Sequence, residues 1–110
     1  MIEYVWKRGL TMAKENKEKT IRINPAAVEK MKLEHKEGFV YRIEISTFNW
    51  RGPIYRLVQT ENTADEDLVV TDHDLTIHAA ADTLEFFEEL KIDIAYMFGD
   101  ENLVVKDRTV

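Results

Sequence analysis

The side chains best suited to recognition gather in one predicted loop, where Asn49, Trp50 and Arg51 precede Tyr55. A tryptophan beside an arginine is the composition of a protein-interaction hot spot. We therefore predict a partner-binding site at these four residues. Two simpler interpretations stay open: Trp50 folds back over the core while Arg51 is solvated, and Tyr55 is a packing residue of its strand, where aromatic residues are common.

Histidines and carboxylates are present, but their spacing predicts no metal site. Asp72, His73 and Asp74 offer nitrogen and oxygen ligands within one short stretch. Adjacent residues rarely converge on one ion without a second segment, so we expect a solvated turn there. The acidic run 61–67 lacks the alternating ligands and central glycine of a calcium loop, and we interpret it as a solvated connection. His78 alternates with the apolar residues of its strand, which predicts a surface histidine.

The sequence also lacks the usual signatures of catalysis. It has no serine nucleophile elbow and no glycine-rich phosphate loop, and only four glycines in all. Its zero cysteines exclude disulfides, thiolate metal ligands and a cysteine nucleophile, and they suit a reducing compartment. We expect a cytoplasmic protein that is not an enzyme and carries no cofactor.

Charge is distributed unevenly along the chain. Residues 1–36 carry nine Lys or Arg and five Asp or Glu, a net charge of +4, whereas residues 37–110 carry six against sixteen, a net charge of −10. An acidic body repels phosphate backbones, so nucleic acid is not an expected partner. No apolar run approaches the roughly 20 residues of a membrane span, so we expect no membrane insertion.

The length of 110 residues is that of one domain. We predict a flexible leader of mixed charge over residues 1–20 and a folded domain over residues 21–110. Met12 is followed by Ala-Lys-Glu-Asn, as in an ordinary cytosolic start. We hypothesise that Met12 is the native start and that residues 1–11 are an over-extended gene prediction, which N-terminal sequencing of the native protein tests.

Hydrophobic periodicity predicts an α+β, β-rich compact domain of many short strands with two helices. The first helix should start at Asn24 and Pro25, an N-cap followed by a proline that loses no hydrogen bond, and end near His35 with Gly38 as the stop. The second should follow a cap at Asp82 and Thr83. We expect strands at 21–23, 39–45, 54–60, 68–70, 75–79, from Ile92 and at 103–105, a loop at 47–53, and the second helix at 84–90.

Five short strings, in collinear order between about Ile21 and Asp107, resemble the HesB-like family, the A-type iron–sulfur cluster carriers. Each string is weak alone, and their common order is what carries the resemblance. The strings are Ile23-Asn-Pro-Ala-Ala-Val, Tyr41-Arg-Ile-Glu-Ile, Glu66-Asp67-Leu-Val, Thr83-Leu-Glu-Phe-Phe and Ile92-Asp93-Ile. The resemblance implies the family's β-rich fold, a compact sandwich of short mixed strands with two helices.

The family's working site consists of three cysteines, none of which is found here. Its Gly-Cys-Ser-Gly loop aligns with residues 49–52, which puts Trp50 in the cysteine position, and its Cys-Gly-Cys tail would follow Asp107, where only three residues remain. Tyr55 matches an aromatic residue that has been proposed as an iron ligand in the family. A single phenol cannot hold a cluster, since iron–sulfur centres want several thiolates.

The resemblance thus implies a cysteine-free HesB-like domain with a binding or accessory role near iron–sulfur cluster assembly, whose partners would be assembly components or client proteins. Family members are commonly dimers or tetramers, so we expect a homodimer. Two alternatives remain open. One is a metal-independent protein-interaction module that uses the loop around Trp50, and the other is a weak mononuclear metal binder that uses Tyr55 with histidines or carboxylates.

Overall fold

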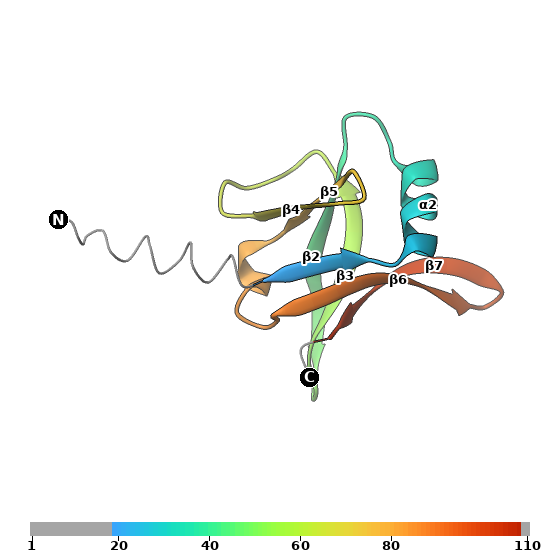
Figure 1. Cartoon of the computed structure of the whole chain (residues 1–110). Helices are drawn as coiled ribbons and strands as arrows, with labels where there is room; N and C mark the ends of the chain where they lie inside the picture. Colours follow the sequence, from blue (N-terminus) through green and yellow to red (C-terminus); the bar gives the residue numbers. More distant parts are fainter. Residues whose placement is uncertain (1–18, 109–110) are drawn as a thin grey trace.

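The computed structural model describes residues 19–108, which form two mixed β-sheets packed face to face with one α-helix beside them (Figure 1). The predicted α+β, β-rich class is therefore confirmed. Most of the predicted leader, with Met12, lies outside the described residues. The elements are β1 (Thr20–Ile23), α2 (Pro25–Glu34), β2 (Val40–Asn49), β3 (Gly52–Thr60), β4 (Leu68–Asp72), β5 (Leu75–Ala79), the short 3-10 turn η1 (Ala81–Thr83), β6 (Glu89–Met97) and β7 (Asp100–Asp107).

The strand order is β1-β6-β7 in one sheet and β3-β2-β5-β4 in the other. The β1–β6 and β2–β5 pairs are parallel, and the remaining pairs are antiparallel. At the sheet edges β3 lies beside β7 and β1 lies beside β4, so each sheet covers part of the other's edges. The core between the sheets is mainly apolar; its largest buried side chains include Phe87, Met31, Ile43, Ile77, Leu90 and Ile92.

Helix α2 begins as its sequence predicts. The side-chain oxygen of Asn24 accepts a hydrogen bond from the backbone N–H of Ala26 (3.0 Å), and Pro25 occupies the first helical position. The helix ends at Glu34, where His35 turns extended, so Gly38 lies in the following turn rather than at the helix end. No helix among the described residues is long and apolar enough to cross a membrane.

The predicted second helix over residues 84–90 is wrong. The chain instead makes the η1 turn, passes through an irregular stretch and enters β6 at Glu89. Thr83 fixes the turn, because its buried hydroxyl donates a hydrogen bond to the carbonyl of Ala80 (2.6 Å). Leu90 then pairs with Ile21 in the parallel ladder. That ladder outweighs an isolated helix of two turns, which nucleates poorly on its own.

The predicted loop over residues 47–53 is also much shorter than expected. Strand β2 continues to Asn49 and β3 starts at Gly52, which leaves only Trp50 and Arg51 in the turn. The pairing register shifts between Ile45 and Thr47, as a β-bulge does, and a bulge adds local twist. The residues predicted to form a loose loop therefore form the apex of a long hairpin, at the lower end of the molecule in Figure 1.

Candidate functional site

The apex of the β2–β3 hairpin brings three of the four predicted site residues together. The side-chain oxygen of Asn49 accepts a hydrogen bond from the backbone N–H of Arg51 (2.8 Å), which closes the turn. The guanidinium carbon of Arg51 lies 4.7 Å from the ring centroid of Trp50, a cation–π contact. Trp50 is 86% exposed, so it does not fold back over the core. The turn instead displays a flat ring with a cation stacked on it.

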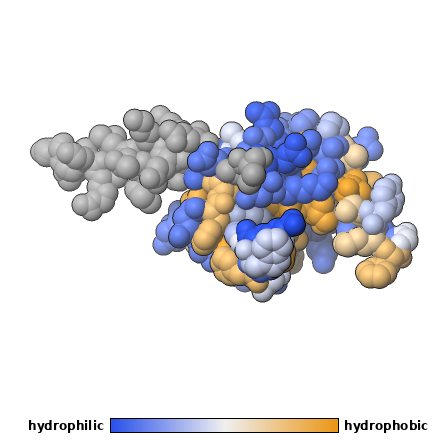
Figure 2. Space-filling view, turned by 90° about the horizontal axis from the view of Figure 1, so that it is seen from below, coloured by the Kyte–Doolittle hydropathy of each residue, from blue (hydrophilic) through white to orange (hydrophobic). Residues whose placement is uncertain are grey.

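Two further aromatic residues that the sequence did not single out stand behind this apex. Phe48 and Phe86 are both exposed, and their rings meet edge to face with centroids 5.5 Å apart. The bulge before Thr47 turns Phe48 toward the same side as the core residue Ile45, but beyond the end of the covering sheet. Figure 2, seen from below, shows orange side chains around this lower hairpin tip.

Tyr55 does not belong to this surface. It is 9% exposed and packs edge to face against Phe87, with ring centroids 6.2 Å apart. Its hydroxyl is buried without a hydrogen-bond partner, whereas the buried hydroxyl of Tyr41 donates to the carbonyl of Met31. Burial, with a smaller contribution from Asp107, raises the pKa of Tyr55 to about 12. The phenol therefore stays protonated at neutral pH and suits packing better than metal ligation.

The chain lacks the thiolates of an iron–sulfur cluster, and the described residues do not fit a metal ion. The 110 residues contain no cysteine, and within residues 19–108 no three His, Asp or Glu side chains gather closely enough to hold a metal. The stretch Asp72 to Asp74 forms the hairpin turn between β4 and β5, with His73 and Asp74 at positive φ. Asp72 is structural, because its Oδ2 accepts a hydrogen bond from the backbone N–H of Ile23 (3.0 Å) and so ties β4 to β1.

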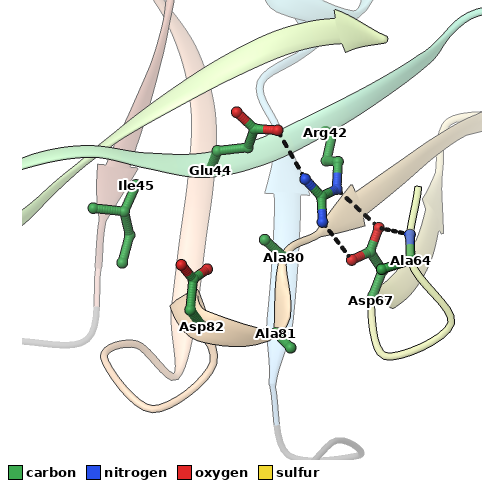
Figure 3. Close-up of a pocket in the computed structure, with 8 residues that line it drawn as sticks. All are labelled: Arg42, Glu44, Ile45, Ala64, Asp67, Ala80, Ala81 and Asp82. Atoms are coloured by element: carbon green, nitrogen blue, oxygen red, sulfur yellow. Dashed lines mark hydrogen bonds and ion pairs between the residues drawn. The ribbon is translucent and has the colours of Figure 1, made fainter. Parts of the chain in front are cut away.

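A buried ion network lies on the outer face of β2, near the root of the same hairpin. Arg42 donates two hydrogen bonds to Asp67, at 2.9 and 2.8 Å, and a third to Glu44 at 2.8 Å (Figure 3). Arg56 donates to the other oxygen of Glu44. The Asp67 side chain is fully buried, which shows that the prediction of a solvated connection is wrong at this residue. The bidentate contact with Arg42, helped by the N–H of Ala64, holds the pKa of Asp67 below its usual value.

A cavity of about 310 Å³ opens beside this network, between Arg42, Asp67 and the carboxylate of Asp82 (Figure 3). Among the described residues that line it, Arg42 is the one cation, and it is already bound to Asp67 and Glu44. His78 contacts the network from β5, with its Nδ1 3.4 Å from Oδ2 of Asp67, and is mostly buried rather than on the surface as predicted. The arrangement is that of a structural ion cluster, in which none of the described lining residues is a cation free to bind an anion.

The fold is shared with proteins of iron–sulfur cluster assembly. The structure of IscA with the [2Fe-2S] cluster superimposes with a TM-score of 0.63 at 18% identity, over 80% of this chain and 82% of IscA. Escherichia coli SufA, described as involved in the biosynthesis of iron–sulfur clusters, gives 0.66 at 13% identity over 83% and 88% of the two chains. A protein from Aquifex aeolicus gives 0.57 at 15% identity over 77% and 88%.

No family model and no curated protein sequence is matched. The likeness is therefore one of fold, and at that level it confirms the resemblance to the A-type carriers that the collinear strings predict.

Proposed function

We propose that this domain, built on the fold of the iron–sulfur carriers, is a non-catalytic protein-binding domain whose contact site is the apex of the β2–β3 hairpin. Asn49 shapes the turn, Trp50 supplies the central ring and Arg51 supplies a cation. Phe48 and Phe86 extend the apolar contact area behind them. The domain does not carry a cluster on thiolates, and it acts as an accessory to the assembly process in the cytoplasm.

The observation that carries this proposal is the exposure of Trp50. An indole ring left 86% in water at the end of a tight turn contributes little to the stability of the core. Tryptophan and arginine are the residues that most often dominate binding energy at protein interfaces. The sequence resemblance also aligns the apex with the carriers' cysteine loop, which supports a recognition turn in the position of a ligand turn.

The exclusion of cluster chemistry has a direct test. Anaerobic reconstitution with iron and sulfide should leave no stable cluster, because the chain offers no thiolate to ligate it. The measurement is visible absorbance of the protein peak after gel filtration. A protein-bound visible band that survives the column would contradict this part of the proposal.

The binding role is tested by Trp50→Ala in the full chain, using affinity capture from an extract of the native source followed by identification of the captured proteins. A specific partner, expected among assembly proteins or their clients, should bind at least about 30-fold more weakly, the equivalent of about 2 kcal/mol. Thermal stability should stay nearly unchanged, because the ring contacts no core residue. Arg51→Ala serves as the second interface variant, and it too should leave stability within about 0.5 kcal/mol.

Phe87→Ala provides the reference for lost packing, since its ring is almost fully buried. It should destabilise the fold by about 3–5 kcal/mol. If Trp50→Ala resembles Phe87→Ala in stability and leaves the captured proteins unchanged, the apex is structural and the proposal is wrong.

We further propose that the chain forms a homodimer. Within residues 19–108, the outer strands of the two sheets, β1, β7, β3 and β4, are hydrogen-bonded to a neighbouring strand on one side only, and pairing with a second copy would cover such edges. Light scattering at concentrations well above micromolar should give the dimer mass. A monomer mass under those conditions would rule out this association.

A further inference from the structure

A second hairpin tip, far from Trp50, exposes an apolar surface of its own. The turn between β6 and β7 carries Tyr96, which is 74% exposed, the partly exposed Met97 and the fully exposed Phe98. Figure 2 shows this tip as the orange group at the right end of the molecule. These three consecutive apolar or aromatic residues lie outside the buried core of the domain.

The backbone of this turn makes the presence of Phe98 more unusual. Phe98 has φ of +54° and Gly99 has φ of +84°, the left-handed pair of a two-residue hairpin turn. Asparagine followed by glycine is the favoured sequence there, because both adopt positive φ readily. A phenylalanine in this conformation costs roughly 1–2 kcal/mol. An aromatic ring held at a strained position and fully in solvent points to a role outside folding.

A groove runs from this hairpin to helix α2, which lies next to it in Figure 1. It has a volume of about 320 Å³, with Ile94 of β6 and Leu33 of α2 as its apolar wall residues. Leu33 is 87% exposed, on the side of the helix away from the buried Ala27 and Met31. The groove and the tip together form one surface on which exposed apolar side chains lie beside charged ones.

The charge around this groove is negative. Glu29, Glu34 and Glu101 line it, and Lys30 is the only cation among its described lining residues. Lys30 is already paired with Glu34, whose carboxylate oxygen lies 2.6 Å from its Nζ. The pKa of Lys30 is raised first by that hydrogen bond and then by the charges of Glu34, Glu101 and Asp100, so the groove has a negative potential that favours cations.

We propose that this groove and tip bind a basic amphipathic segment of a partner protein. Apolar side chains of that segment would contact Leu33, Tyr96 and Phe98, and its lysines or arginines would pair with Glu29 and Glu101. Nucleic acid and anionic membranes are disfavoured, because the same carboxylates repel phosphate. The site is separate from the β2–β3 apex, which carries the positive charge of Arg51, whereas the groove is lined by carboxylates. A negative result at one hairpin therefore does not contradict the proposal for the other.

The test uses the full chain and a display library of random 12-residue peptides. Enriched peptides should carry net positive charge and spaced apolar residues, and fluorescence anisotropy of synthetic copies should show a Kd that rises with ionic strength. Phe98→Asn removes the ring but suits the turn, and Leu33→Asp places a charge in the groove. Each should weaken binding at least 10-fold. Glu101→Gln can still accept the hydrogen bond from the Tyr96 hydroxyl and should reduce the salt dependence.

Trp50→Ala is the matched control, because it removes an exposed aromatic from the other hairpin and should leave the peptide Kd unchanged. Three results would overturn the proposal: no enrichment, enrichment only of acidic peptides whose binding Trp50→Ala leaves unchanged, or binding of basic peptides that survives Phe98→Asn and Leu33→Asp. Self-association of the free chain that Phe98→Asn abolishes would also overturn it, since a second copy of the chain would then occupy the groove.

Discussion

The two long hairpins use one architecture to display opposite chemistry. Both extend past the core and end in a two-residue turn with an exposed aromatic ring, Trp50 in one and Phe98 in the other. The β2–β3 apex places the cation of Arg51 on its ring, whereas the β6–β7 tip is followed directly by Asp100 and Glu101. A sandwich of this kind can therefore offer two binding surfaces that would not compete for the same partner.

The hairpins also differ in how their roots are held. The outer face of β2 is fixed by the ion cluster of Arg42, Glu44 and the buried Asp67. The β6–β7 root carries a looser pair on its outer face, with Nζ of Lys106 3.5 Å from Oδ2 of Asp93. The first root therefore depends on charge, and the second depends on the apolar residues that line the core.

The largest expected effect in this comparison comes from Asp67→Ala. The substitution removes the carboxylate that accepts two hydrogen bonds from Arg42. Breaking a buried ion pair costs about 3–5 kcal/mol of stability. Urea denaturation measures the loss. Asp93→Ala is the control at the other root, where a half-exposed pair should contribute less than about 1 kcal/mol. Equal losses at Asp67 and Asp93 would show that the two roots do not differ.

The next effect concerns the pH dependence of stability, to which the charged groups at the β2–β3 root should contribute. The hydrogen bonds from Arg42 hold the pKa of Asp67 below its unfolded value, and contacts with Arg42 and Arg56 lower that of Glu44 despite partial burial. A lowered folded pKa stabilises the protein above the unfolded value and loses that effect as pH falls through the folded value. Stability should thus be at its full value near neutral pH and fall in acid, below about pH 4.

Asp67→Asn isolates this contribution, because it removes the titrating group and keeps its size. Melting curves at pH 7 and at successively lower pH should show a difference between Asp67→Asn and wild type that is largest at pH 7 and shrinks in acid. A difference that stays constant with pH would mean that the charge of Asp67 does not stabilise the hairpin root.

Sequence reasoning recovered the sheets better than the surfaces. Alternation predicted the strand at 39–45, which lies largely within β2 and buries Tyr41 and Ile43, and Asn24 and Pro25 marked the start of α2. It failed at residues 84–90, where spacing suited a helix but long-range pairing with β1 decided the conformation. The Arg42–Asp67 pair could not be predicted either, because the two residues are 25 positions apart in the sequence and meet only in the folded chain.

The candidate sites show the same division. Trp50 and Arg51 could be proposed from the sequence because their composition and their alignment with a ligand loop are local properties. Phe48 and Phe86 were not proposed, because a bulge and an irregular stretch bring them together. Phe98 was not singled out either, because the sequence does not show that its ring stands fully in solvent at positive φ.

The smallest predicted effect has the opposite sign from the others. Phe98→Asn should raise the free energy of unfolding by about 1 kcal/mol, because asparagine adopts the left-handed conformation of this turn at lower cost than phenylalanine. Trp50→Asn should bring no such gain, since Trp50 is not at positive φ. Paired urea titrations of the two variants measure the difference. If Phe98→Asn destabilises the chain, the ring contributes to folding, and the argument that it is held there for binding loses its basis.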